Sequence, residues 1–386
     1  MQTERLHSFL LCVMITPKVS DVLGIINSLA PFDLAEEWDN AGLQVGNPSA
    51  FAGKIMVALD AGKSAVEAAV ATGCQLLLTH HPMIFRPLKK ISTADPLGRL
   101  IALAIINDLA IIALHTNFDI ADGGVNDLLA ERLGVSVCRP LKFTVVEDLV
   151  KLCVFVPKGH EEEVMNALFS FSGFIGNYSD CSFQTGGVGT FKPLKGAAPF
   201  LGEIGKREYA EESRIEVLLR KADVNAAVGS LISVHPYEEP AFDIYPLINK
   251  GKTDGLGRLG ELPAAVTLSE FAVAVKERLG LDGVRFVGAA NRKVRKIALC
   301  GGSGASLIRD AWNHGADVMV TGDIKYHEAR EAEDLGLALV DAGHFGTEQP
   351  MIRGLTELLG KELAKKEYEA EITAFEGEKE PFRYIE

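Results

Sequence analysis

The feature that most constrains this chain is an internal repeat of short apolar runs. Residues 73–79 and 315–321 align without a gap, and in both segments a glycine opens the run and a threonine closes it. Other apolar runs also correspond, 55–59 with 297–300 and 111–114 with 337–340. Buried parallel strands read as continuous apolar runs of this kind. The repeat therefore predicts two related α/β halves whose equivalent strand ends face a shared cleft.

Stretches with helical spacing separate these runs. Apolar residues recur at helical intervals in 19–30, 64–72 and 96–107, and Pro31 ends the first stretch. Strands that alternate with helices of this length imply a parallel sheet that is covered on both faces.

The middle of the chain has a different pattern. Six elements alternate there, as a strand at 151–156, a helix at 160–171, strands at 182–190 and 214–219, a helix at 224–233 and a strand at 241–246. That order predicts a ferredoxin-like α+β module inserted into the core. Residues 250–255 are polar and predict a flexible exit. The expected domains are an N-terminal extension (1–16), the first core half (17–142), the insert (143–250) and the second core half (251–386).

Composition narrows the functional class. The 386 residues carry a net charge of -13, which argues against a surface dedicated to nucleic acid. Six scattered cysteines form no Cys-x-x-Cys pair, which fits small buried residues in a reducing cytoplasm. Residues 9–15 are apolar but too short to span a membrane and lack a small-residue cleavage site, so Met14 is an alternative start.

Polar side chains follow three of the predicted strands. His80, His81 and Pro82 come directly after the run at 76–78, and the segments 115–119 and 341–348 follow two other strands. The three segments together contain His, Asp and Glu, whose nitrogen and oxygen atoms suit borderline divalent ions. Because ligands bind at the carboxyl ends of strands in open α/β sheets, we expect a metal centre there.

Six motifs in this order resemble one family. They are Trp38-Asp39-Asn40-x-Gly42, Thr79-His80-His81-Pro82, His115-Thr116-Asn117-x-Asp119, Gly123-Gly124-Val125-Asn126-Asp127, Thr321-Gly322-Asp323-x-x-Tyr326-His327-Glu328 and Gly343-His344-x-x-x-Glu348. The chain resembles the GTP cyclohydrolase 1 type 2 homologues, also called Nif-three-like proteins, over residues 19–140 and 254–373. Its insert resembles that of the longer bacterial branch, which is similar to PII-like and cation-tolerance proteins.

The resemblance implies a dinuclear metal site, a toroidal homohexamer and a poorly settled activity. The implied ligands are His80, His81, Asp119, His344 and Glu348. The two ions would be divalent and could be zinc, iron, manganese, cobalt or nickel, since the ligand types admit them all.

The local chemistry of these ligands can be argued separately. Pro82 favours an extended His81, and successive residues of an extended chain point in opposite directions, so we expect His80 and His81 to reach different ions. Asp119 or Glu348 would then bridge the two ions. His344 and Glu348 share one face if a helix begins after Gly343. The alternative for two adjacent histidines before a proline is a capped strand end.

Four further residues are candidates for supporting roles. His327 is the candidate proton shuttle, and Asp323 either orients it or the metal ligands, or caps a helix. His115 either supports the metal ligands or is a buried histidine with satisfied hydrogen bonds. Arg258 could hold an anionic substrate, although an ion-paired arginine explains it more simply.

Two segments have simpler explanations than function. Residues 36–46 read more readily as a surface loop anchored by Trp38 than as a rim of the site. The string at 235–240, His-Pro-Tyr-Glu-Glu-Pro, contains metal-ligand residue types but is best explained as a turn before an edge strand, with subunit contact or partner binding as the next reading.

These observations favour a metal-dependent hydrolase of a small or nucleotide-like substrate, because paired ions about 3.5 to 4 Å apart lower the pKa of bound water towards neutrality. GTP ring opening is the reaction that the family name implies. The alternative is a metal-binding regulatory or metal-delivery protein without turnover, which the PII-like insert favours. Nucleic-acid binding inside the ring is a weaker alternative, and no membrane association is expected.

Overall fold

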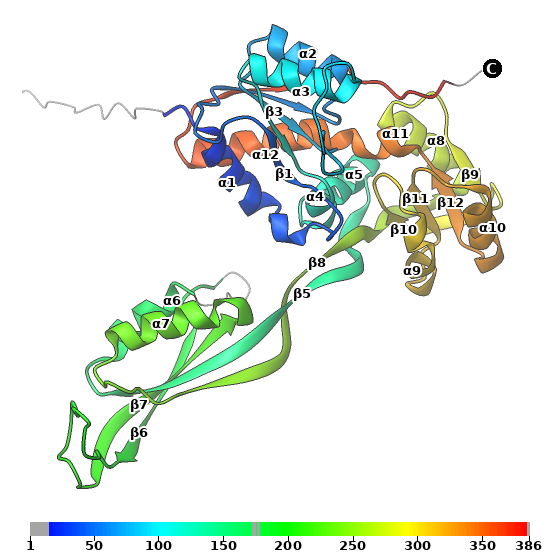
Figure 1. Cartoon of the computed structure of the whole chain (residues 1–386). Helices are drawn as coiled ribbons and strands as arrows, with labels where there is room; N and C mark the ends of the chain where they lie inside the picture. Colours follow the sequence, from blue (N-terminus) through cyan, green and yellow to red (C-terminus); the bar gives the residue numbers. More distant parts are fainter. Residues whose placement is uncertain (1–14, 172–174, 176–177, 384–386) are drawn as a thin grey trace, which may run out of the picture. The chain divides into compact units, whose positions relative to one another are not determined.

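The computed structural model describes residues 15–171, 175 and 178–383 (Figure 1). Most of the expected N-terminal extension, residues 1–14, lies outside this range. The chain divides into two compact units. We call residues 1–144 together with 254–386 the core unit, and residues Val145–Thr253 the inserted unit.

The first half of the core unit is built on a five-stranded sheet. Its strand order is β1-β4-β3-β2-β13, in which β1 alone is antiparallel to its neighbour. The strands are β1 (Gly42–Val45), β2 (Lys54–Ala58), β3 (Leu76–Thr79), β4 (Ala110–Ala113) and β13 (Glu371–Ala374). The helices are α1 (Val19–Leu29), α2 (Lys63–Ala71), α3 (Pro96–Ile106), α4 (Thr116–Ile120) and α12 (Pro350–Lys365).

Helices cover both faces of this sheet, which is why its central strand has no polar face (Figure 1). Leu76 and Leu78 of β3 pack with residues of α1 and α12. Leu77 points the other way and packs with residues of α2 and α3. The alternation of side chains along a strand thus places every residue of the apolar run in a core.

The second half repeats this architecture. Its strands run in the order β8-β10-β11-β12-β9, with β10, β11 and β12 parallel. They are β8 (Phe242–Thr267), β9 (Arg285–Val287), β10 (Lys293–Leu299), β11 (Val318–Thr321) and β12 (Ala338–Asp341). The helices are α5 (Val125–Leu133) and α8 (Leu268–Leu279) against one face, α9 (Ile308–Asn313) and α10 (Tyr326–Leu335) against the other, and the short α11 (His344–Glu348). Three 3₁₀ turns complete the element order, Phe32–Leu34, Lys221–Asp223 and Ala305–Leu307.

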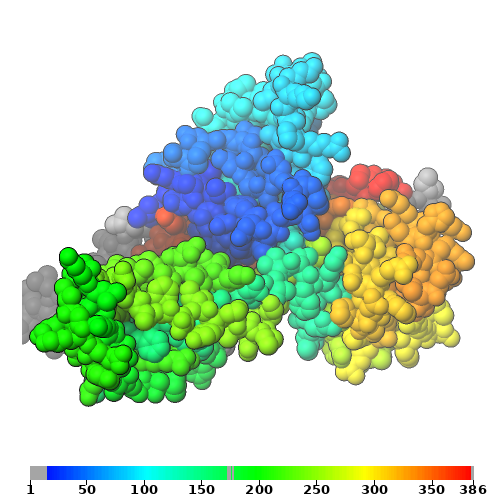
Figure 2. All heavy atoms as spheres, turned by 60° about the horizontal axis from the view of Figure 1, so that its bottom comes forward, coloured from blue at the N-terminus to red at the C-terminus, as the bar shows by residue number. Residues whose placement is uncertain are grey.

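The predicted relation between the halves is visible in the strand pairing. Each half contains three adjacent parallel strands, β2-β3-β4 in the first and β10-β11-β12 in the second. In each sheet one antiparallel strand lies beside the third of these, β1 beside β4 and β9 beside β12. Thr79 pairs with Ala113, and its counterpart Thr321 pairs with Asp341. A five-residue helix follows each third strand, α4 in the first half and α11 in the second. Figure 2 shows the first half in blue and cyan beside the second half in yellow and orange.

The inserted unit has the strand order of a ferredoxin-like module. Its elements are β5 (Ser136–Pro157), α6 (Glu161–Phe169), β6 (Ser182–Phe191), β7 (Glu208–Arg220), α7 (Val224–Val234) and the first part of β8. The sheet runs β6-β7-β5-β8, and apolar residues of α6 and α7 pack against it. The boundaries of the unit fall inside β5 and β8, both of which continue into the core unit.

Two local expectations were wrong. Residues 36–46 are not only a loop, because β1 pairs with the buried strand β4 and gains backbone hydrogen bonds there. The supposed flexible exit at residues 250–255 lies within β8, where ladder hydrogen bonds stabilise a polar sequence. Among the described residues, no helix is both long and apolar enough to cross a membrane.

Candidate metal centre

Four histidines of the core unit are oriented alike. In each ring, Nδ1 lies 2.7 to 2.8 Å from an oxygen that can only accept a hydrogen bond, so Nδ1–H is the donor and Nε2 remains available. The acceptors are the Leu114 carbonyl for His80, Asp60 for His81, Asp39 for His115 and Asp323 for His344. This pattern is typical of metal-binding histidines, whose second nitrogen is held by a carboxylate or carbonyl.

The Nε2 atoms converge around the buried carboxylate of Glu348. Its oxygens lie 3.1 Å from His81 Nε2, 3.2 Å from His344 Nε2 and 3.6 Å from His80 Nε2. His81 Nε2 and His344 Nε2 are themselves 3.3 Å apart. Asp119 approaches from α4, with its Oδ1 3.7 Å from His80 Nε2. Candidate ligand atoms of His80, His81 and His115 lie within 4.8 Å of one another, as do those of His81, His344 and Glu348.

The buried atoms of this cluster that lack a hydrogen bond include His80 Nε2 and Asp119 Oδ1. His80 is fully buried, so water does not satisfy its ring. An unsatisfied buried polar atom is costly unless it has another partner. A divalent cation that binds both atoms would satisfy them, and the donor set of imidazole nitrogen and carboxylate oxygen suits such an ion. The residues present therefore fit a metal.

The charges of the cluster support the same conclusion. Burial lowers the pKa of His80, but the charges of Asp119 and Glu348 outweigh burial and raise it. Burial likewise lowers the pKa of His81, whereas its hydrogen bonds to Asp60 and Glu348 raise it to about 10. The hydrogen bond to Glu348 raises the pKa of His344 to about 9. In the absence of an ion, protons supply the positive charge that these carboxylates favour, and a bound cation would replace those protons.

Glu348 itself behaves as a permanent carboxylate. Burial would raise its pKa, but the charge of His80 and hydrogen bonds from the surrounding histidines hold the pKa well below its usual value. Asp119 differs, because burial raises its pKa. A cation near both groups would favour the charged form of Asp119.

The end of β3 positions two of the histidines. The backbone amides of His80 and His81 both donate to the Leu59 carbonyl, at 3.1 and 3.0 Å, so the chain bends here and is not extended. As a result the two rings lie side by side, with centroids 5.0 Å apart. The expectation that they point in opposite directions was wrong for this reason. Whether they bind the same ion or different ions stays a prediction.

The helix α11 positions His344 and Glu348, which lie four residues apart and on one face, as the spacing predicts. Gly343, with φ of 75°, precedes the helix. Gly302 lies against the pair in the left-handed region, at φ of 59°, and a methyl group there would overlap Glu348 Oε1. The chain thus has a glycine where the cluster leaves no room for a side chain.

His115 and Asp39 form the side of the cluster nearest β1. The Asp39 side chain is fully shielded and accepts hydrogen bonds from His115 Nδ1 and from the backbone and hydroxyl groups of Thr116. Burial would raise the pKa of Asp39, but these hydrogen bonds outweigh it and lower the pKa to about 2. The Trp38 ring contacts His115, with centroids 5.9 Å apart. The segment 36–46 is therefore a wall of the site and not a detached surface loop, contrary to the interpretation that the sequence favoured.

Asp323 orients His344, one of the candidate metal ligands, and does not cap a helix. Its Oδ2 accepts from His344 Nδ1 at 2.7 Å, whereas α10 begins two residues after Ile324 with Lys325 at the N-cap. His327 is exposed on α10, and its ring contacts Tyr326. Among the described residues, His327 belongs to neither group of candidate metal ligands, and its role as the proton shuttle stays a prediction.

The guanidinium of Arg258 is fully used in hydrogen bonds within the protein. Arg258 is buried, and its guanidinium donates to both oxygens of Asp127 and to the carbonyls of Ala121, Gly255 and Gly257. Every N–H of the guanidinium is occupied, so none remains for an anionic substrate. The contacts join α5 and the loop before it to strand β8.

Sequence reasoning missed Asp39 and Asp60 as holders of histidines. Asp60 follows β2, so it lies at the same edge of the sheet as His80, and this position was the available signal. Asp39 gave a weaker signal, since it lies in a turn-rich segment 76 residues before its partner.

The cluster opens into a cavity of about 1190 Å³. His81, His344 and Asp323 line it, and the C-terminal segment 377–383 closes one side. Glu378 fastens that segment by accepting from the backbone amides of Leu59 and Asp60, both at 2.7 Å.

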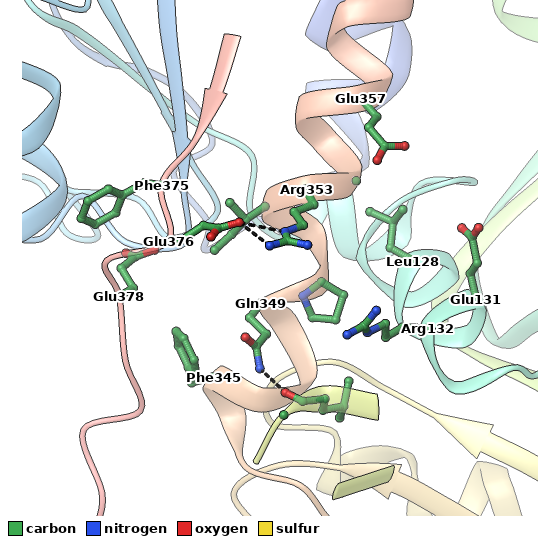
Figure 3. A pocket seen from close by; sticks show the side chains of 15 residues that line it. Leu128, Glu131, Arg132, Phe345, Gln349, Arg353, Glu357, Phe375, Glu376 and Glu378 are labelled. Atoms are coloured by element: carbon green, nitrogen blue, oxygen red, sulfur yellow. Dashed lines mark hydrogen bonds and ion pairs between the residues drawn. The ribbon is translucent and has the colours of Figure 1, made fainter. Parts of the chain in front are cut away.

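A second cavity, of about 750 Å³, also borders this segment (Figure 3). Phe345 and Glu378 line both cavities. Arg353 pairs with Glu376, and Gln349 donates to the Leu279 carbonyl. Its lining includes no member of the histidine cluster, so the first cavity is the one that serves the candidate metal centre.

The fold and the site together define an α/β protein of two related halves with a histidine and carboxylate cluster that can hold a metal ion. The family model described as Duf34/NIF3 (NGG1p interacting factor 3) matches residues 17–381, and the chain belongs to this family.

Known relatives are similar over almost the whole chain. A protein of Halalkalibacterium halodurans named "GTP cyclohydrolase 1 type 2 homolog" is 43% identical over 94% of this chain and 98% of its own length. A Bacillus subtilis protein of the same name shows the same identity and coverage. The crystal structure of a Bacillus cereus protein related to NIF3 matches with a TM-score of 0.87 and 42% identity, over 96% of this chain and 100% of that one.

Proposed function

We propose that this protein is a metal-dependent hydrolase of a nucleotide-like or other small substrate, with two divalent ions per chain. The observation that carries the proposal is the convergence of the Nε2 atoms of His80, His81 and His344 on the buried Glu348 carboxylate, with His80 Nε2 and Asp119 Oδ1 left without hydrogen bonds. The name shared by the relatives, "GTP cyclohydrolase 1 type 2 homolog", makes GTP ring opening the first reaction to test.

The five residues that would hold the ions are His80, His81, Asp119, His344 and Glu348. Divalent ions bound there would lower the pKa of a water molecule towards neutrality. Two carboxylates orient the candidate ligands. Asp60 accepts a hydrogen bond from Nδ1 of His81 and Asp323 accepts one from Nδ1 of His344, which fixes both rings.

His115 takes the place that the sequence suggested for His327. Its Nδ1–H donates to Asp39, so its Nε2 faces the cluster as an acceptor. From this position Nε2 can bind an ion or take a proton from a group held at the cluster. The shielded Asp39 carboxylate keeps the ring in this tautomer.

The remaining expectations belong to the same proposal. We propose a toroidal homohexamer and a PII-like character for the inserted unit, both on the strength of the family resemblance. Mass photometry tests the first, since a hexamer has about six times the mass of the 41.6 kDa chain.

The test of function combines elemental analysis with a panel of nucleotide and phosphoester substrates that includes GTP. Protein purified without oxygen is compared with the His81→Ala and Glu348→Gln variants, and His327→Asn is the matched control, an exposed histidine of the same unit. We expect about two ions per chain and an activity, both lost in the two site variants and retained in the control.

Other outcomes are also informative. Two ions without turnover would favour the alternative, a metal-binding regulatory or metal-delivery protein. In that case the ions should pass readily to a competing apo-protein. No bound metal in any preparation would refute the proposed centre.

A further inference from the structure

The inserted unit has a pocket of its own, of about 390 Å³, between the loop that follows β6 and the turn at 235–240. Four aromatic rings line it, from Phe155, Phe191, Phe200 and Tyr237. The Tyr237 ring centroid lies 5.7 Å from that of Phe191 and 6.2 Å from that of Phe200. Aromatic rings at such distances present their faces or edges to a common space.

A buried carboxylate also lines this pocket. Glu212 is only 7% exposed, and its Oε1 accepts a hydrogen bond from the Tyr237 hydroxyl at 3.0 Å. Its other oxygen, Oε2, accepts no hydrogen bond from the described residues and is not fully buried, and no described lysine or arginine forms an ion pair with Glu212. A carboxylate that is mostly withdrawn from water and has one neutral donor is stabilised by a nearby cation.

The sequence makes room for this carboxylate. Gly189 on β6 lies directly against Glu212 Oε2, and a methyl group at this position would overlap that atom. This glycine of β6 therefore has a local steric reason, whereas Gly186 and Gly187 have open space beside them. The absence of a side chain at Gly189 thus leaves the space that the Glu212 carboxylate occupies.

The turn at 235–240 is held rigidly beside it. The Tyr237 amide donates to His235 Nδ1 at 3.1 Å, so His235 carries its proton on Nε2 and donates to the Phe155 carbonyl, also at 3.1 Å. The Ala198 amide donates to Glu238 at 3.0 Å, which ties the loop after β6 to the turn. His235 is thus a positioning residue for Tyr237, and the pocket is preformed.

The charge of the lining is acidic. Glu212, Glu238 and Glu239 line the pocket against one cation, Lys192. An anion would meet this excess of negative charge, and an uncharged apolar molecule would leave the buried carboxylate uncompensated. A small cation with apolar substituents satisfies both the carboxylate and the ring faces, which attract cations through their quadrupoles.

We propose that this pocket binds a small organic ammonium ion, with its charge near Glu212 Oε2 and its alkyl groups against the rings of Phe191, Phe200 and Tyr237. The site lies wholly within the inserted unit. It is separate from the candidate metal centre and does not depend on the proposed hydrolase function.

The experiment compares two ligands of equal shape on the full chain. Choline carries the ammonium charge, 3,3-dimethylbutan-1-ol is its uncharged isostere, and n-propylammonium represents primary amines. Saturation-transfer NMR detects binding, and calorimetry gives the dissociation constants. We expect at least one ammonium ion to bind about tenfold or more tightly than the uncharged alcohol.

Variants locate the site. Glu212→Gln should weaken ammonium binding about tenfold or more, whereas Glu211→Gln, the exposed neighbour that pairs with Lys158, should leave it unchanged. Tyr237→Phe keeps the ring and should retain binding. Phe191→Leu removes a ring face and should weaken ammonium binding. Far-UV circular dichroism shows whether Glu212→Gln folds, and if it does not, Phe191→Leu still tests the site.

The proposal is overturned by any of three results. One is equal affinity for an ammonium ion and the uncharged isostere. Another is unchanged affinity in both Glu212→Gln and Phe191→Leu. The third is no measurable binding of choline or n-propylammonium to the wild-type chain.

Discussion

Replacement of Asp39 by asparagine tests whether the segment before β1 is part of the site. In the wild type, the shielded Asp39 carboxylate accepts from His115 Nδ1 at 2.7 Å and from the Thr116 amide at 3.0 Å. Asparagine has nearly the same shape but no charge. Its side-chain oxygen can accept a hydrogen bond, but its NH₂ group cannot, so only one of the two acceptor positions remains. We expect the variant to fold and the core unit to be less stable at neutral pH.

The magnitude follows from the pKa of Asp39, which is lowered from 3.8 to about 2. At about 1.4 kcal/mol per pKa unit, this shift corresponds to at most about 2.5 kcal/mol of folding free energy. The surrounding segment is partly exposed and solvent screens part of the interaction, so we expect about 1 to 2 kcal/mol.

The sign of the pH dependence follows as well. The pKa is lower in the folded state than in the unfolded state, so the stabilisation is complete well above pH 3.8 and is lost as the pH falls through about 2. The difference between wild type and variant should shrink to roughly half near pH 3.

Tryptophan fluorescence provides the assay, because both tryptophans of the chain, Trp38 and Trp312, belong to the core unit. Urea unfolding of the chelator-treated protein is followed from pH 7 to pH 3 at one protein concentration. Asp33→Asn, an exposed aspartate of the same segment, is the control and should change stability by less than about 0.5 kcal/mol. A difference for Asp39→Asn that is absent at pH 7, or that does not shrink towards pH 3, would contradict this reasoning.

Three other predictions concern the core unit. Asp60→Asn should lower metal affinity about 10 to 100-fold in a chelator competition, because His81 loses its acceptor, and a change below about threefold would refute that role. Gly302→Ala should abolish metal binding in the same assay, whereas Gly315→Ala, with a similar positive φ but open space around it, should bind normally. Arg258→Met should lower the free energy of unfolding of the core unit by about 3 kcal/mol or more, since a buried partner of Asp127 is lost, and tryptophan-monitored urea unfolding that shows less than about 1 kcal/mol would oppose its role in joining α5 to β8.

The sequence predicted the central strands of the fold well because burial on both faces leaves a simple signal. Residues 76–78 and 318–320 are wholly apolar and wholly buried, so their period and length identify parallel strands. The strands β1, β9 and β13 were missed because they have three or four residues, are partly exposed and lie at sheet edges. Their pairing depends on neighbours that lie far away in the sequence.

In the candidate site, too, some residues could be predicted from the sequence and others could not. His80, His81, His344 and Glu348 were recognisable because they follow strands, and strand ends converge in an α/β sheet. The carboxylates that hold these rings were not recognisable, since each role depends on one hydrogen bond across the fold. His327 was chosen because its residue type suits proton transfer, and its position on the exposed surface of α10 could not be predicted from residue type.

The unequal use of the two halves explains why the repeat yields one cluster and not two. By register, His80 and His81 of the first half correspond to Gly322 and Asp323 of the second. A side chain at Gly322 would overlap the backbone of Gly343 and His344, because α11 begins directly against it. The second half therefore cannot present a histidine at that position.

The second half contributes from its short helix instead. Helix α11 supplies His344 and Glu348, and Asp323, at the position of His81, has become the acceptor that orients His344. The first half supplies the adjacent histidines, and from α4 it adds Asp119. Glu348 of one half must meet His80 and His81 of the other, so the cluster exists only when the halves are joined.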